Sequence, residues 1–168
     1  IVNDLVATVP FPKRMRWNTK TVGFPRPIRY ILALYGNTVP DFELDGIRAG
    51  RSTRGHYVQT PDMFDVQNID DYENLLLSKK VVLDHGRRRE MIAAQLEAKA
   101  AENSLVLVRD DELLDIVTFL VENPVVVACR FEESFLDVPD VVLITEMKEH
   151  QKYFALRKKD GSLSNMFL

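Results

Sequence analysis

One polar segment carries side chains of the kinds that contact phosphate and sugar groups. Within residues 50–56, Arg51, Arg54 and His56 stand with two hydroxyl residues between glycines. Guanidinium, hydroxyl and imidazole groups commonly donate hydrogen bonds to phosphate oxygens and ribose hydroxyls. The pattern predicts a contact with nucleic acid, and a polar turn between two strands is the alternative.

A second polar segment spans residues 145–154 and suits a helix. On a helix, Lys148 and Lys152 share one face at i, i+4 spacing, and Met147 and His150 share another. Lys148, His150 and Lys152 are therefore candidate contacts to RNA. The alternative is a helix whose Met and His pack inward while its lysines face solvent.

A third segment, residues 13–17, places three cations beside the only tryptophan. Arg16 and Trp17 are candidates for stacking on a nucleic-acid base. The alternative is a tryptophan that anchors the edge of a core beneath aliphatic arginine stems.

Familiar catalytic motifs are absent from the sequence. It has no Gly-rich phosphate loop, no nucleophile elbow and no cysteine pair for zinc. The three histidines lie far apart and lack the spacing of metal ligands. Cys129 ends an apolar strand pattern, which predicts a buried, unreactive thiol. We therefore expect no catalytic residue, no metal site and no cofactor in this segment.

Composition and charge are those of a globular chain with a basic beginning. The 168 residues are 46% hydrophobic and 28% charged, which predicts one domain over residues 1–168. No apolar run is long enough to span a membrane, and a single cysteine favours a reducing compartment. Residues 1–60 hold nine Lys/Arg and four Asp/Glu, whereas residues 61–168 hold thirteen and twenty-one. This asymmetry predicts a face for an anionic partner, with charge scattered over a solvated surface as the alternative.

Hydrophobic periodicity and turn residues predict the strands. We expect strands at 28–35, 39–47 with a turn at 45–46, 51–58, 81–83 and 125–130, and a hairpin of 153–157 with 162–168. Residues 163–168 stop within a strand pattern. Residues 1–9 look like the tail of a helix that begins upstream, so we expect a segment excised from a longer protein.

Helices are expected at 70–77, at 85–103 with Asp84 as N-cap, after Asp110 as far as 123–124, and at 141–150. Residues 87–89 are three arginines in a first helical turn, where cations oppose the helix dipole, so we expect them to pair with carboxylates, with an anionic partner as the alternative. Helices and strands do not alternate strictly. The sequence therefore predicts an α+β fold with a mixed, largely antiparallel sheet and packed helices.

Several strings together resemble one known family over the whole chain and in the right order. They are residues 13–17, 24–28, 46–56, 82–84 with 87–89, 117–125 and, most strongly, 131–139 with 147–154. They resemble the beta subunit of bacterial heterotetrameric glycyl-tRNA synthetase. Asn18 departs from the pattern, in which glycine is expected.

The resemblance implies an enzyme that joins glycine to tRNA(Gly) with ATP, a glycine–tRNA ligase. It places the catalytic core, with ATP and Mg²⁺, in the alpha subunit, and gives the beta subunit a role in tRNA recognition. The implied partners are the alpha subunit, tRNA(Gly) and the remaining domains of the beta subunit, in the cytoplasm and without a membrane. The implied fold is similar to the B3/4 region of phenylalanyl-tRNA synthetase.

Three roles for the segment follow from this resemblance. The first is tRNA binding or scaffolding, with contacts at Arg16, Trp17, Arg51, Arg54, His56, Lys148, His150 and Lys152. The second is an editing-like hydrolase on mischarged tRNA near His56 and His150, which is weakly motivated because glycine is the smallest amino acid and a tight pocket excludes its competitors. The third is a pure protein-interaction scaffold, which a large exposed apolar patch would favour.

Overall fold

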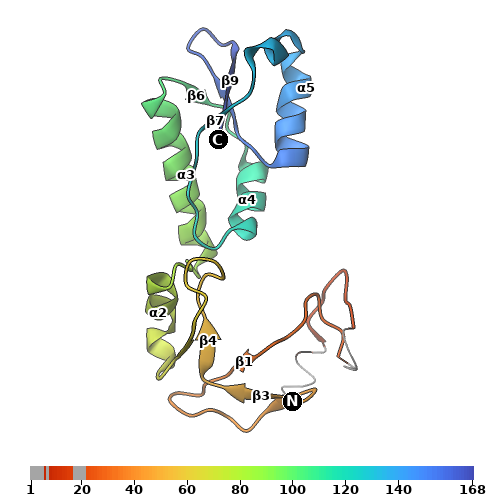
Figure 1. The fold of residues 1–168 in the computed structure, drawn as a ribbon, viewed down its shortest axis with the longest axis vertical. Helices are drawn as coiled ribbons and strands as arrows, with labels where there is room; N and C mark the ends of the chain where they lie inside the picture. Colours follow the sequence, from red (N-terminus) through yellow and green to blue (C-terminus); the bar gives the residue numbers. More distant parts are fainter. Residues whose placement is uncertain (1–5, 7, 17–21) are drawn as a thin grey trace. The chain divides into compact units, whose positions relative to one another are not determined.

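The computed structural model describes residues 6, 8–16 and 22–168. Its internal contacts divide the chain into two compact units, unit 1 at residues 1–81 and unit 2 at residues 82–168 (Figure 1). The single domain expected from the sequence stays a prediction. The expected helical tail at 1–9 falls largely outside the described residues.

Unit 1 contains a small mixed sheet. Strand β3 (Ile47–Gly50) pairs in parallel with β1 (Ile31–Leu32) and antiparallel with β2 (Glu43–Leu44). The predicted turn at 45–46 is confirmed, because Asp45 and Gly46 have φ of 52° and 83°, as a tight hairpin requires. The strand predicted at 28–35 is shorter, since only Ile31 and Leu32 pair with β3.

A second strand pair and a helix complete unit 1. Strand β4 (Ser52–Arg54) pairs antiparallel with β5 (Met63–Asp65). The short helix η1 (Ile69–Asp71) leads into α2 (Tyr72–Ser78), which confirms the predicted helix. The strand predicted at 51–58 ends at residue 54 because the chain then turns. Buried Thr53, Val66 and Leu76 lie between these elements.

Unit 2 begins with a capped helix whose arginines hold a second helix. The Asp84 carboxylate accepts the backbone N–H of Arg87 and starts α3 (His85–Glu102), as predicted. Asp110 likewise caps α4 (Asp111–Leu120). Arg89 of α3 pairs with two aspartates of α4, at 2.9 and 2.6 Å, so the expected pairing of the arginine run with carboxylates is confirmed there. Arg88 instead donates to carbonyl oxygens, including that of Thr118.

A four-stranded antiparallel sheet forms the centre of unit 2. Its order is β6 (Val106–Leu107), β8 (Ala155–Arg157), β9 (Leu163–Phe167) and β7 (Cys129–Arg130). The predicted hairpin of β8 and β9 is confirmed. Alternate side chains serve two cores: Phe154, Leu156, Met166 and Leu168 pack with α3 and α4, whereas Ala155, Leu163 and Phe167 pack with Met147 on the opposite side.

The segment between β7 and β8 is helical throughout most of its length. Helix η2 (Glu133–Asp137) is followed by α5 (Asp140–Thr145), which continues as the wider π-helix η3 (Glu146–Gln151). Lys152 ends it with φ of 60°. The helix predicted at 141–150 is therefore confirmed in place, and the whole chain has the predicted α+β class.

The strand predicted at 125–130 is confirmed only at Cys129–Arg130, and the one predicted at 81–83 is wrong; side-chain hydrogen bonds explain both differences. The amide of Gln95 donates to the Pro124 carbonyl and accepts the Val126 N–H, so residues 125–128 lie along α3 without strand pairing. Residues 81–83 form no strand either, because Arg88 takes the Val82 carbonyl. Cys129 is exposed, which contradicts the predicted buried thiol. No helix among the described residues is long and apolar enough to cross a membrane.

Candidate nucleic-acid interface

A cationic hollow in the described part of unit 1 has a volume of about 620 Å³. It is lined by two exposed arginines, Arg26 and Arg29, by Tyr57, and by the apolar Met15, Pro25 and Pro27. The side chain of Tyr57 is prominent, with 66% of its surface exposed. The hollow therefore combines positive charge with an accessible aromatic ring, which is the combination that single-stranded nucleic acid binds.

Two segments of the basic region meet beside this hollow. Met15 and Phe24 exchange backbone hydrogen bonds of 3.0 and 3.1 Å, which bring residues 13–16 alongside the string that contains the arginines. Phe11 packs edge-on against Phe24, with ring centroids 4.9 Å apart. The chain bends at Pro25 and Arg26, and Pro25 and Pro27 restrict the backbone around this bend, so the arginine side chains are presented from a stiff segment.

The loop that carries Tyr57 is fixed by the residues before it. The Nδ1 atom of His56 accepts the backbone N–H groups of Val58 and Gln59, at 3.3 and 3.2 Å. The His56 N–H donates to the Lys79 carbonyl at the end of α2, at 2.9 Å. His56 thus acts in the structure as the organiser of a turn.

Gly55 allows this loop to lie against α2. A Cβ at position 55 would lie 2.5 Å from the Lys79 Cβ and 2.6 Å from the Lys79 carbonyl oxygen. Thr60 donates its hydroxyl to the same carbonyl, at 2.7 Å. Only a residue without a side chain fits here, so glycine fixes the position of the Tyr57 turn.

Arg54 lies behind the tyrosine. Its Cζ atom is 6.0 Å from the centroid of the Tyr57 ring, a cation–π distance. The Arg54 Nε atom is buried and has no hydrogen-bond partner among the described residues. The structure therefore brings predicted Arg54 and His56 together with Tyr57.

The other predicted residues of unit 1 are placed differently. Arg51 donates to the Gln67 side chain at 2.8 Å and to the Asn37 carbonyl at 3.3 Å, so it ties two loops together. Arg16 is exposed. Trp17 lies outside the described residues.

In unit 2, Lys148 is engaged by two carboxylates. Its Nζ lies 2.9 Å from Asp110 and 2.8 Å from Glu112, at the start of α4. These carboxylates raise the pKa of Lys148 above its ordinary value. The charge of Lys148 is thus largely balanced within unit 2, and its contact with RNA stays a prediction.

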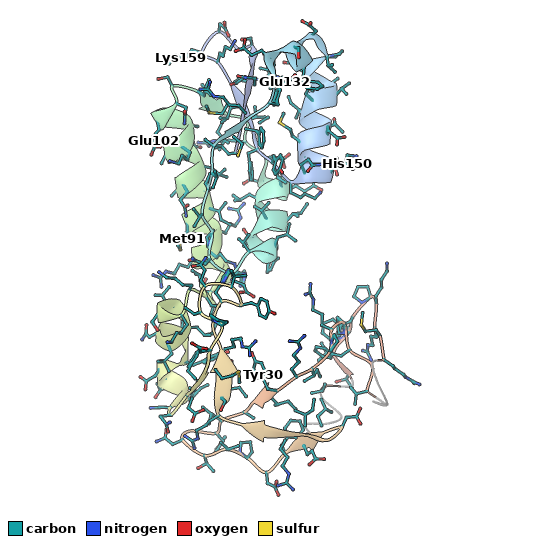
Figure 2. All side chains as sticks on the ribbon, in the orientation of Figure 1. Tyr30, Met91, Glu102, Glu132, His150 and Lys159 are labelled. Carbon is teal, nitrogen blue, oxygen red and sulfur yellow. The ribbon has the colours of Figure 1, made fainter. Side chains whose placement is uncertain are left out.

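His150 and Lys152 differ from the expected pattern. His150 is exposed near the end of η3 (Figure 2). Its Nε2 atom lies 3.8 Å from the Glu146 carboxylate, whereas Met147 is buried. Lys152 follows the helix in a left-handed conformation. The two lysines are therefore not successive members of one helical row, because the helix widens and then ends between them.

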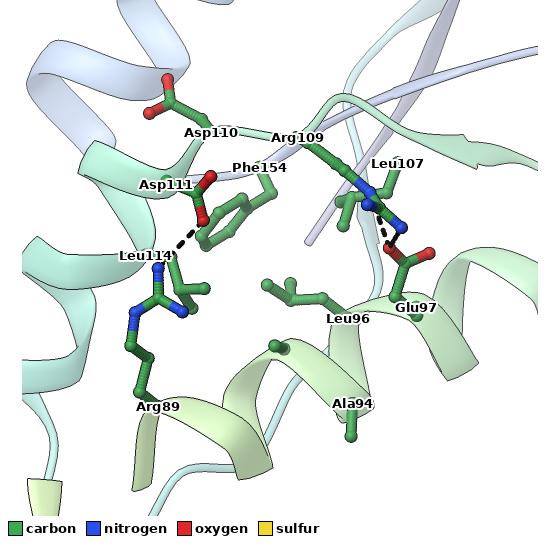
Figure 3. A pocket seen from close by; sticks show the side chains of 11 residues that line it. Arg89, Ala94, Leu96, Glu97, Leu107, Arg109, Asp110, Asp111, Leu114 and Phe154 are labelled. Atoms are coloured by element: carbon green, nitrogen blue, oxygen red, sulfur yellow. Dashed lines mark hydrogen bonds and ion pairs between the residues drawn. The ribbon is translucent and has the colours of Figure 1, made fainter. Parts of the chain in front are cut away.

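A hollow of about 350 Å³ in unit 2 is lined by charges that neutralise one another (Figure 3). Arg89 pairs with Asp111, and Arg109 pairs with Glu97 at 2.8 Å, above an apolar floor that includes Phe154. Arginines held in this way contribute to packing between α3 and its neighbours. Among the described residues, no three His, Cys, Asp or Glu side chains gather as a metal site requires.

Unit 2 also has an apolar groove of about 390 Å³ beside residues 124–127. Val125 and Val127 project from this segment with 70% and 60% of their surfaces exposed. Tyr153 and Phe167 contribute stacked rings to the groove, with centroids 4.6 Å apart. Such an apolar surface is typical of a protein contact.

Comparison with known proteins gives the family. All 168 residues match the family model described as glycyl-tRNA synthetase beta subunit. The chain belongs to the glycyl-tRNA synthetase beta subunit family. The resemblance seen in the sequence is therefore confirmed.

Curated members of the glycyl-tRNA synthetase beta subunit family are similar over nearly the whole chain. The glycine–tRNA ligase beta subunit of Desulfatibacillum aliphaticivorans is 46% identical over 98% of the chain. Those of Chromohalobacter salexigens and Bacillus subtilis are 43% and 38% identical over 100% and 99% of it. In each case the match covers 24% of the relative, so the chain spans about a quarter of their length.

Sequence reasoning missed Arg26, Arg29 and Tyr57. Arg26 and Arg29 stand at i, i+3 in a proline-rich string, which is a signal for a stiff cationic segment. Tyr57 directly follows the polar motif 50–56. Only the fold shows that these two strings line one hollow.

Replacing Gly55 with alanine tests the close contact beneath the Tyr57 loop. Because the new Cβ would overlap the Lys79 backbone, Gly55→Ala should lower the free energy of unfolding by about 1–3 kcal/mol. Gly50→Ala is the matched control, since nothing lies within 4 Å of a Cβ there. Urea unfolding measures both, and equal stability of the two variants would contradict the assignment.

Asp110→Asn tests the ion pair with Lys148, because asparagine keeps an oxygen for capping α4 but loses the charge. Burial raises the pKa of Asp110, but hydrogen bonds from Leu113 and Lys148 outweigh it and hold the pKa below the ordinary 3.8. Because the pKa of Asp110 is lower in the folded protein, its carboxylate stabilises the fold fully at pH values above the ordinary pKa. This stabilisation is lost as the pH falls through the pKa of the folded state. Because the Glu112 and Asp110 carboxylates raise the pKa of Lys148, the lysine stays charged across this pH range, and in its pair with Asp110 only the carboxylate titrates.

We therefore expect Asp110→Asn to have a lower urea midpoint than the parent near neutral pH, and this difference to shrink below about pH 4. Asp137→Asn, at an exposed position of η2, serves as the control and should leave the midpoint unchanged. A difference that is the same at both pH values would show that the charge of Asp110 does not stabilise unit 2.

Proposed function

We propose that this chain is the part of a glycine–tRNA ligase whose unit 1 contacts tRNA(Gly) through the cationic hollow. In this proposal the ligation chemistry, with ATP and Mg²⁺, takes place in the alpha subunit. The described residues of this chain supply binding surface.

The state of the arginines in the hollow carries the proposal. Neither Arg26 nor Arg29 has a carboxylate partner among the described residues, whereas Arg48, Arg89, Arg109 and Arg157 each have at least one. A guanidinium that no carboxylate neutralises keeps its charge and donors for phosphate. Two such groups beside Tyr57 form a surface suited to RNA.

The eight residues expected from the sequence enter this proposal in different ways. Arg54 and Arg16 belong to the same unit as the hollow, and His56 shapes the loop of Tyr57. Arg51, Lys148, His150, Lys152 and Trp17 remain predicted contacts. The hydrolase alternative needs His56 as a base, but its Nδ1 already accepts two backbone N–H groups, which favours the structural role.

A second candidate function is assembly with the alpha subunit, and the apolar groove of unit 2 favours it. Val125 and Val127 expose most of their surfaces beside this groove, and water contact with such side chains is unfavourable. Burial of this groove against another subunit would remove that cost. RNA contact by unit 1 and protein contact by unit 2 use different residues, so they can be tested separately.

Replacement of both arginines of the hollow tests RNA contact. In the full-length beta subunit assembled with the alpha subunit, Arg26→Ala with Arg29→Ala should weaken binding of tRNA(Gly) about 10-fold or more at low salt. The slope of log affinity against log salt should fall by about one to two, because up to two phosphate contacts are lost.

Arg48→Ala is the control for loss of one exposed arginine in unit 1, because Glu43 already pairs with Arg48. It should change the affinity by less than about twofold. If the double variant binds tRNA with the affinity and salt slope of the parent, the hollow does not contact tRNA.

Charge placed in the apolar groove tests subunit assembly. Val125→Asp with Val127→Asp should reduce co-purification of the alpha subunit, since a carboxylate loses its hydration when the groove is covered. Both positions are exposed and outside regular structure, so folding should persist. The measurement is the ratio of the two subunits by analytical ultracentrifugation. An unchanged ratio would remove this candidate function, while intact binding of tRNA by the beta subunit would confirm that the variant is folded.

A further inference from the structure

We propose that the hollow of unit 1 accepts one unpaired nucleotide, with its base stacked on the Tyr57 ring. This inference rests on the proposed contact with tRNA and specifies the RNA element that the hollow recognises. It concerns the same six lining residues, Met15, Pro25, Arg26, Pro27, Arg29 and Tyr57.

The size and lining of the hollow suit a nucleotide. Its volume of about 620 Å³ falls within the range of small-molecule sites. Met15 and the two prolines provide apolar surface for the edges and face of a base, while Arg26 and Arg29 provide donors for the adjoining phosphates. The apolar part of the hollow thus matches the base of a nucleotide, and the two arginines match its phosphates.

Tyr57 provides the stacking surface. Two thirds of the surface of Tyr57 is exposed, and covering an exposed aromatic ring is favourable. Arg54 lies over the ring at 6.0 Å, so the guanidinium, the tyrosine and a base would form consecutive layers. The loop that carries the ring is fixed before RNA binds. Gly55 lies against the Lys79 backbone before Tyr57, and the His56 ring accepts the backbone N–H groups of Val58 and Gln59 after it.

An unpaired nucleotide fits this geometry better than a duplex does. Within a duplex both faces of a base are covered by its neighbours, and side chains reach mainly phosphates and 2′-hydroxyls. The Tyr57 ring lies within a hollow, so it can stack only on a base that is not stacked between its neighbours in the RNA. Unpaired nucleotides occur in the loops of a tRNA and at its 3′ end, and both present the same base and phosphate chemistry.

The experiment compares Tyr57→Leu with Tyr57→Phe in the assembled full-length enzyme. Leucine removes the aromatic face, so tRNA(Gly) binding should weaken by about 5- to 100-fold, whereas phenylalanine should bind within about twofold of the parent. The salt slope should stay that of the parent in both variants, because neither loses a phosphate contact. A single-stranded RNA oligonucleotide should compete with tRNA for the parent enzyme, and a fully paired RNA of the same length should not.

The outcomes separate this inference from the proposed function. If Tyr57→Leu binds like the parent while the Arg26/Arg29 double variant binds weakly, the hollow contacts only the backbone and the stacking inference is overturned. If the double variant also binds like the parent, the contact with tRNA itself is overturned. If Tyr57→Phe binds as poorly as Tyr57→Leu, the hydroxyl and not the ring is responsible, which also overturns stacking.

A tRNA(Gly) without its unpaired 3′ nucleotides identifies the source of the base. If the effect of Tyr57→Leu vanishes on this truncated tRNA, the stacked nucleotide belongs to the 3′ end. If the effect persists, it belongs to a loop. Both results support recognition of an unpaired nucleotide.

Discussion

The contact between Gly55 and the carboxyl end of α2 determines the candidate site. With no Cβ at position 55, the chain after β4 lies directly against the Lys79 backbone, where a carbonyl oxygen accepts both the His56 N–H and the Thr60 hydroxyl. The turn that follows is completed by the His56 ring. If this turn were mobile, Tyr57 would lose conformational entropy when it bound a ligand. Because the turn is anchored, that entropy is already lost on folding and binding costs less.

Charge has a different use in each unit. In unit 2 the carboxylates of α4 and its N-cap meet Arg89 and Lys148, so charges there join helices to one another. Exposed pairs of this kind contribute little individually, and their effect is mainly to fix which faces meet. In unit 1 the arginines of the proline-rich string lack carboxylate partners among the described residues. Such charges do not stabilise the fold, which is consistent with a use in binding.

The sequence predicted those elements whose signals are local. Asp84 and Asp110 cap the helices that follow them directly, and the hairpin around Gly161 follows from its turn and alternation. The strand predicted at 125–130 is reduced to Cys129–Arg130, because Gln95 takes the backbone groups of Pro124 and Val126. Gln95 lies 29 and 31 positions earlier in the sequence, on helix α3. The same limit applies to the site: Arg54 and His56 have local signals, whereas Arg26 and Tyr57 become neighbours only through tertiary structure.

The uneven distribution of charge has a kinetic consequence. Residues 1–81 contain eleven Lys/Arg against nine Asp/Glu, and residues 82–168 contain eleven against sixteen. A polyanion is therefore attracted to one unit and repelled by the other while it is still diffusing, within a screening length of about 8 Å. Stacking acts only after contact and has no such range. The arginines would thus govern how fast RNA arrives in the correct orientation, and the tyrosine how long it stays.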